Sequence, residues 1–206
     1  MSKNDGVRHR NDVSVELWIE EYKQVGNSTL IYKKQGDDHV LFEKNDFCLI
    51  VFNHSQEYML KTFGKNTVCV DSTHGLNGYD FELTTVMIID EFGEGFPGAC
   101  MFTNRKDTLH EFFFEQIQLK TGIIFTNTFM SDITSVFYNA WEKVMAPAKN
   151  QLFCSWHIDH AWRANLNKIS NSEKRGIVYK ILKALVSELC ETDFLKELKE
   201  FREIFR

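Results

Sequence analysis

Two aspartates stand at the ends of short apolar segments. Asp71 closes TVCVD (67–71), and Asp132 closes IIFTNTFMSD (123–132). Carboxylates on neighbouring strands can hold two hard cations such as Mg²⁺ about 3.5–4 Å apart, which activate an attacking oxygen and stabilise the leaving oxygen of a phosphodiester. The pair therefore predicts two-metal phosphodiester chemistry. The alternative is local, because an aspartate at a strand end often closes a turn, and Asp132 also suits the N-cap of a following helix.

Polar residues follow the first aspartate directly. Thr73 and His74 come two and three positions after it, and Gly75 and Gly78 permit a tight turn before the next apolar segment. His74 can orient a water molecule or contact a phosphate. It can equally form a hydrogen bond within the turn, and the residues alone favour that simpler interpretation.

A third feature is Cys154-x-x-His157, with His160 one helical turn further on. A structural zinc site needs four ligands, so these three residues would need a distant cysteine to complete it. A buried cysteine at the end of a strand and a histidine at the start of a helix explain the spacing more simply. Zinc is therefore not expected.

The charges divide unevenly along the chain. Residues 1–145 hold 13 basic and 21 acidic residues, whereas residues 146–206 hold 11 basic and 8 acidic ones. A positive face of this kind can meet a phosphate backbone, although a solvated helix face is the simpler interpretation. The candidate DNA-binding residues are the basic side chains of the stretch 163–183: Arg163, Lys168, Lys174, Arg175, Lys180 and Lys183.

The elements that must position the two aspartates alternate in type. The pattern predicts strands over 67–71, 81–90 and 96–103, a helix from 107, a strand over 123–132, a helix over 133–144 and a strand over 151–155. Only helical periodicity follows. The order β-β-β-α-β-α-β-α is that of a ribonuclease H-like fold, so the prediction is an α/β (α+β) class with a mixed five-stranded sheet and flanking helices.

The remaining segments complete the predicted domain organisation. Residues 1–12 are expected to form a disordered leader, and residues 13–64 an α/β segment that packs on the core, with strands around 29–33, 40–43 and 47–52. The core itself is expected to span 65–158. Residues 159–206 then form the start of a helical insertion.

Composition restricts the class of protein. The chain has 206 residues, 43% of them hydrophobic, and 18 are phenylalanine, which is typical of a packed globular chain. No apolar run reaches the roughly 20 residues of a membrane span, and the first residues lack the apolar stretch of a signal peptide. The five widely spaced cysteines favour a reduced, intracellular protein over a disulfide framework.

The ordered combination CVDSTHG (69–75), TFMSDITSVF (128–137) and LFCSWHI (152–158) resembles the transposase domain of Mutator-like elements (MULE) over about residues 40–170. Far-red-response transcription factors, which look like domesticated relatives, share this layout. The resemblance implies a DDE-type core that uses two Mg²⁺ (or Mn²⁺) ions for DNA hydrolysis and strand transfer, with Asp71 and Asp132 as its first two acids. It makes Thr73, His74, Cys154 and His157 family markers.

The resemblance also implies a nuclear protein that binds DNA and can form homo-oligomers. Relatives carry the third acid, a glutamate, after a long helical insertion, and no motif here singles one out among five glutamates between 188 and 203, while Asp159 lacks the family's support. We therefore expect a transposase core that is incomplete or inactive alone. The alternative is a domesticated DNA-binding or regulatory module without catalysis.

Overall fold

The structure is a computed structural model that describes residues 11–24, 28–73, 75, 81–105 and 109–204. The chain divides into two compact units, residues 1–152 and residues 153–206, which we treat separately. The boundaries expected from the sequence, after residues 12, 64 and 158, stay predictions.

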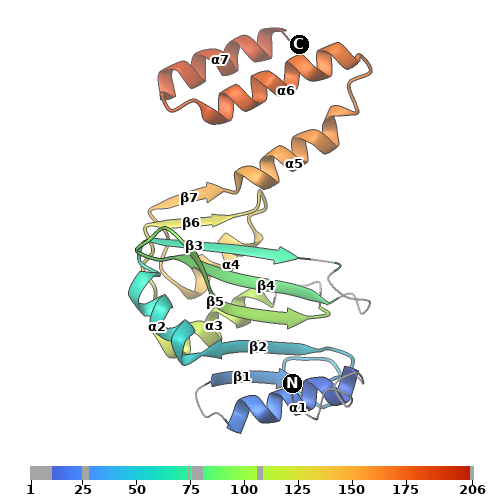
Figure 1. Cartoon of the computed structure of the whole chain (residues 1–206), viewed down its shortest axis with the longest axis vertical. Coiled ribbons are helices and arrows are strands. Elements are labelled where there is room, and N and C mark those ends of the chain that lie inside the picture. Colours follow the sequence, from blue (N-terminus) through green and yellow to red (C-terminus); the bar gives the residue numbers. More distant parts are fainter. Residues whose placement is uncertain (1–10, 25–27, 74, 76–80, 106–108, 205–206) are drawn as a thin grey trace. The chain divides into compact units, whose positions relative to one another are not determined.

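The first unit is built on one mixed sheet (Figure 1). The strands lie in the order β1-β2-β5-β4-β3-β6-β7. Their bounds are β1 Ser28–Lys33, β2 Cys48–Asn53, β3 Thr67–Thr73, β4 Glu82–Ile89, β5 Gly95–Thr103, β6 Thr128–Ser131 and β7 Asn150–Phe153. The last residue of β7 already belongs to the second unit.

The predicted fold class is confirmed. From β3 onward the elements follow the expected order β-β-β-α-β-α-β-α, with α3 spanning His110–Thr121, α4 Val136–Val144 and α5 Ser155–Leu166. The sheet has seven strands where the sequence predicted five, because β1 and β2 extend it rather than pack on it. β2 pairs antiparallel with β5, from Cys48 opposite Thr103, and so covers the backbone groups that β5 would otherwise expose at an edge.

The prediction of a strand over residues 40–43 is wrong. Residues 34–47 form a loop around the Lys33 side chain, which is only 2% exposed. Its ammonium group donates to the carbonyl oxygens of Glu43 (2.6 Å), Lys44 (3.0 Å) and Asp46 (2.8 Å). These carbonyl groups therefore accept hydrogen bonds from a buried charge and not from the backbone of a neighbouring strand.

The main core lies on one face of the sheet. There α2 (His54–Phe63), α3 and α4 cover side chains such as Val68 and Val70 of β3. Trp141 of α4 is fully buried and packs edge-on against Phe114 of α3 and at a tilt against Phe129 of β6, each with ring centroids 5.3 Å apart. One aromatic side chain thus joins two helices to the strand that precedes Asp132.

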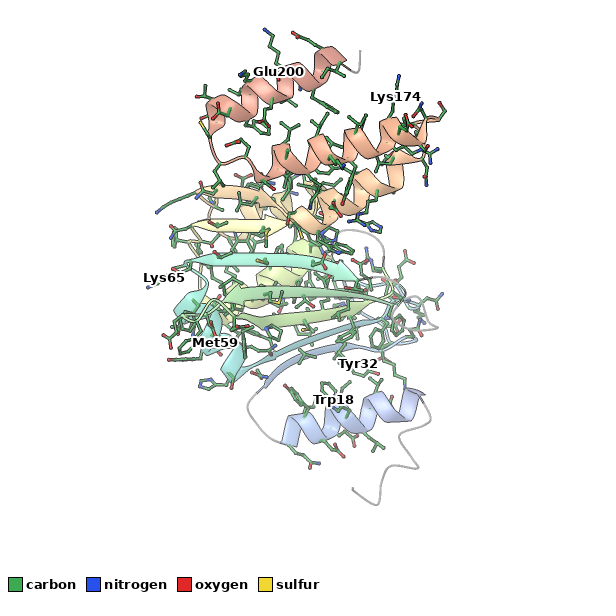
Figure 2. The ribbon with its side chains drawn as sticks, turned by 45° about the horizontal axis from the view of Figure 1, so that its top comes forward. Trp18, Tyr32, Met59, Lys65, Lys174 and Glu200 are labelled. Atoms are coloured by element: carbon green, nitrogen blue, oxygen red, sulfur yellow. The ribbon has the colours of Figure 1, made fainter. Side chains whose placement is uncertain are left out.

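A smaller cluster lies on the opposite face, under α1 (Asn11–Gln24). Ile19 of α1 packs there with Leu49 of β2, whose neighbours Cys48 and Ile50 belong to the main core. Strand alternation therefore separates the two clusters. Figure 2 labels Trp18 on α1 and Tyr32 on β1, beside this smaller cluster.

The second unit contains α5, α6 (Ser172–Ser187) and α7 (Glu191–Ile204). Its described residues include two buried apolar side chains, Val178 and Leu185, both on α6. Polar contacts supplement this small core: the Asp159 carboxylate of α5 accepts hydrogen bonds from Arg163 Nε (2.8 Å) and from the Tyr179 hydroxyl of α6 (2.7 Å). Among the described residues, no helix of either unit is both long and apolar enough to cross a membrane.

A close approach between α2 and β5 gives a stability prediction. A Cβ on Gly98 would lie 2.9 Å from Cγ of Leu60, which is 1% exposed in the main core. Gly98→Ala must displace Leu60, so we expect the free energy of unfolding to fall by about 1–3 kcal/mol in urea denaturation followed by circular dichroism. Gly176→Ala is the control: its Cβ meets no atom within 4 Å, and alanine in a helix adds up to about 1 kcal/mol. Equal stability of Gly98→Ala and the unaltered chain would contradict the close packing.

Candidate metal site at the sheet edge

The pairing of β3 with β6 brings the two aspartates together. These strands are parallel, with Thr67 opposite Thr128, Val68 opposite Phe129 and Cys69 opposite Met130. Two further steps of the same register bring Asp71 level with Asp132. Adjacent strands lie about 4.8 Å apart, and residues that are level on parallel strands point to the same face. Both aspartates therefore lie at the same end of the sheet, Asp71 within β3 and Asp132 directly after β6.

Asp71 lies near the carboxyl end of β3 and is exposed. Val68 and Val70, on the opposite face of the strand, are buried in the main core, so the backbone that carries Asp71 is held by packing. On the neighbouring strand β4, Thr85 is its register partner. An exposed carboxylate on a rigid strand is suited to bind a ligand that arrives from solvent.

Asp132 is the first residue after β6 and is half-buried. Its Oδ1 accepts hydrogen bonds from the Thr134 backbone N–H (3.0 Å) and from Thr134 Oγ1 (2.8 Å). The aspartate therefore closes a turn. It is not the N-cap of α4, because that helix begins at Val136 with Ser135 as its N-cap. Among the described residues, both hydrogen bonds that its carboxylate accepts use Oδ1, while its backbone carbonyl accepts from Ser131 Oγ (3.1 Å).

The other family markers lie in different places. Thr73 ends β3 and is exposed, whereas His74 lies outside the described residues. Cys154 is the half-buried N-cap residue of α5, and its carbonyl accepts from the Ile158 N–H (3.1 Å). His157 lies within the first turn of α5, with its ring centroid 4.8 Å from that of Trp156. Cys154 and His157 thus belong to the second unit, and Asp71 and Asp132 to the first.

Comparison with known families gives a match over this region. Residues 67–161 match the family model of the MULE transposase domain. Over these residues the chain is similar to the MULE transposase domain. The matched segment runs from β3 into α5 and contains Asp71, Asp132, Cys154 and His157, so the resemblance seen in the motifs is confirmed within these bounds. A search of curated proteins finds no match.

Asp71 and Asp132 lie at the same end of the sheet, and the described residues single out no third acid beside them. Among the described residues, no group of three or more His, Cys, Asp or Glu side chains is arranged to hold a metal ion. Asp159, which follows the last strand, is already engaged by Arg163 and Tyr179, with Lys183 Nζ 3.7 Å from its Oδ1. The hydrogen bonds from Tyr179 and Arg163 lower the pKa of Asp159. This carboxylate therefore joins α5 to α6.

His110, the first residue of α3, lies close enough to Asp132 to interact with its charge. Nothing in the sequence indicated this proximity. The His110 ring lies 4.6 Å from that of Phe137 in the first turn of α4, and its buried Nδ1 has no hydrogen-bond partner among the described residues. Burial lowers the pKa of His110, and the carboxylates of Glu82 and Asp132 partly offset this by raising it. Only the fold brings these three residues together, so no local spacing in the sequence could have shown it.

The six candidate DNA-binding residues fall into two groups. Arg163 and Lys183 contact Asp159, and Arg175 donates from Nε to the Ile169 carbonyl (2.5 Å) and from Nη2 to that of Ser170 (3.2 Å). These three hold the helices and their connection. The other three are exposed and form no ion pair with any described residue: Lys168, Lys174 and Lys180. Lys174 is labelled at the start of α6 in Figure 2.

The surroundings of His110 give a prediction with a defined sign. A nearby carboxylate favours the imidazolium, so Glu82→Gln is expected to lower the pKa of His110 further in an NMR titration of the imidazole protons. Glu94→Gln, next to the turn at the far end of β4, is the matched control and is expected to leave this pKa unchanged. A pKa of His110 that does not respond to Glu82→Gln would show that Glu82 does not act on the ring.

Proposed function

We propose that this chain is the core of a MULE-type DDE transposase, incomplete or inactive alone, in which Asp71 and Asp132 are two of the acids that serve reactions at DNA phosphodiester bonds. The parallel pairing of β3 with β6 supports the proposal, because it puts Asp71 in one strand and Asp132 directly after its neighbour at the same end of the sheet, within the matched residues. The proposal includes DNA as the partner and the nucleus as the location, as the family resemblance implies. Homo-oligomer formation is part of the same expectation.

The carboxylate pair, Asp71 and Asp132, fits hard divalent cations. Both side chains offer only oxygen ligands, which Mg²⁺ and Mn²⁺ prefer. Asp71 is exposed, and Asp132 keeps Oδ2 available beside the Oδ1 that binds Thr134. The Thr134 contacts orient Asp132, so little side-chain freedom remains to be lost on binding.

The proposed chemistry divides between the bound ions and the chain. When bound, the metal ions supply Lewis-acid activation of the attacking oxygen and charge stabilisation at the phosphodiester. Asp71 and Asp132 would hold the ions at one end of the sheet, where the packing of β3 and β6 restrains the backbone on which these residues lie. Two carboxylates fill few of the roughly six positions around Mg²⁺. We therefore propose that the chain alone binds metal weakly and cleaves DNA slowly or not at all.

A binding measurement tests the pair independently of turnover. Mn²⁺ titration of the full chain, followed by electron paramagnetic resonance, is expected to show a site whose affinity falls by about tenfold or more in Asp71→Asn and in Asp132→Asn. Nicking of supercoiled DNA in Mg²⁺ or Mn²⁺, where it occurs, is expected to disappear in the same variants.

Asp90→Asn is the matched control. Asp90 follows β4 at the other end of the sheet, where its Oδ1 accepts from the Phe92 and Glu94 N–H groups, both at 2.9 Å. The substitution Asp90→Asn changes charge and shape as Asp71→Asn and Asp132→Asn do, but in a turn away from these two aspartates. Mn²⁺ affinity that is equal in Asp71→Asn, Asp90→Asn and the unaltered chain would overturn the proposal.

A second candidate function, DNA binding without catalysis, is favoured by the three unengaged lysines on α6 and just before it. If Lys168, Lys174 and Lys180 contact phosphates, log affinity falls less steeply with log salt concentration when all three are replaced with glutamine. We expect the magnitude of this negative slope to decrease by about 3. The slope is measured by fluorescence anisotropy of a labelled duplex across a salt series.

The control for the lysines makes the same change of net charge in the first unit: Lys65, Lys120 and Lys149, all exposed, replaced by glutamine. We expect it to change the slope far less. An equal slope for both triple variants would mean that net charge alone, and not the α6 region, determines the affinity. Arg175 is unsuitable for this test because its loss would also disturb the connection between α5 and α6.

A further inference from the structure

An exposed tryptophan on α5 is held in a defined orientation. Trp156 is 64% exposed, and its ring lies parallel to that of His160, one helical turn later, with centroids 5.2 Å apart and an interplanar angle of 12°. His157 meets the same indole edge-on at 4.8 Å. Both contacts come from α5 itself, so the arrangement belongs to the second unit alone.

Core packing does not explain this side chain. The described residues of α5 include no buried side chain, and the indole of Trp156 keeps most of its surface in water. Exposing a large aromatic side chain forgoes the favourable burial of roughly 150–250 Å². The stack on His160 nevertheless restricts its rotation. A flat, exposed and already ordered π-surface can receive another flat ring at a low entropic cost.

We propose that Trp156, backed by His160, is a stacking platform for an unpaired nucleobase of single-stranded DNA. The inference rests on the proposed function, in that DNA is the polymer concerned. Every base has a π-face, so stacking on an aromatic side chain accepts any sequence, while duplex DNA keeps its bases stacked on one another and offers none to the indole. The platform therefore discriminates unpaired from paired DNA.

The charges around the platform favour a nucleic acid. The nearest acid in the sequence, Asp159, is paired with Arg163 and lies 3.7 Å from Lys183, so it does not stand as an uncompensated negative charge. Lys168, Lys174 and Lys180 are exposed on the same unit. These charges permit a phosphate backbone to approach the indole.

The chain contains a natural comparison. Trp18 of α1 is also exposed (37%) and stacks on Tyr22, with centroids 4.7 Å apart and an interplanar angle of 21°. Its helix, however, contains Glu16, Glu20 and Glu21 against a single basic residue, Lys23, and although Glu16 pairs with Lys34 this excess of acids disfavours phosphates. Trp156 and Trp18 therefore have similar stacking geometry but differ in the sign of the net charge of the residues around them.

The experiment measures the affinity of the full chain for labelled oligothymidylate by fluorescence anisotropy. We expect Trp156→Ala to weaken binding by about 5- to 150-fold, the range of one base–aromatic stack, and Trp156→Phe to retain most of the affinity. Trp18→Ala is expected to bind like the unaltered chain. An oligonucleotide with abasic sites in place of thymidines is expected to bind the unaltered chain as weakly as thymidylate binds Trp156→Ala. Duplex affinity is expected to be the same in all variants.

The outcomes separate this inference from the proposed function. Equal oligothymidylate affinity of Trp156→Ala and Trp18→Ala, or no preference of the unaltered chain for thymidylate over the abasic strand, overturns the platform whether or not the Asp71 site binds Mn²⁺. If Asp71→Asn leaves Mn²⁺ affinity unchanged, the proposed function fails. The stacking platform is still supported in that case if Trp156→Ala weakens binding of oligothymidylate. Circular dichroism of each variant, together with the Trp156→Phe rescue, distinguishes a lost stack from a misfolded helix.

Discussion

The parallel pairing of β3 with β6 is the contact on which the rest of the first unit depends. It is non-local, since each paired residue of β3 lies opposite one 61 positions later in the chain, and the chain between the two strands contains β4, β5 and α3. The pairing is stabilised from the core side, where Val68 and Phe129 are level with each other and fully buried, and Trp141 covers Phe129. Hydrophobic packing on one face therefore fixes the pairing of the two strands that lead to Asp71 and Asp132.

Much of this arrangement could be predicted from the sequence, because it follows from local pattern. The strands that end at Asp71 and Asp132 are short apolar runs, and α4 shows its buried stripe clearly. The features that the sequence did not predict depend on contacts between residues that are distant in the chain. The segment 40–43 has strand-forming residues, but the buried ammonium of Lys33 claims the neighbouring carbonyl groups. His110 enters the site region through the packing of α3 on α4, which no spacing in the sequence reports.

The second unit follows a different physical rule from the first. Its described residues bury two apolar side chains, Val178 and Leu185, and Asp159 is the centre of a polar network that links α5 to α6. Counting basic residues in the sequence therefore overstates the charge available for DNA. Half of the six residues first considered satisfy internal partners, and the field that a phosphate meets comes from the lysines that remain.

The strand alternation around Asp132 has a consequence for how such a site can change over time. Side chains on β6 alternate between the core and the open face, so inserting or deleting a single residue between Thr128 and Asp132 would move Phe129 out of the core or rotate the aspartate to the wrong face. Point substitutions on the open face leave this phase intact. We therefore expect this region to tolerate substitutions on the open face far better than changes in length, and the turn that holds Thr134 against Asp132 falls under the same restriction.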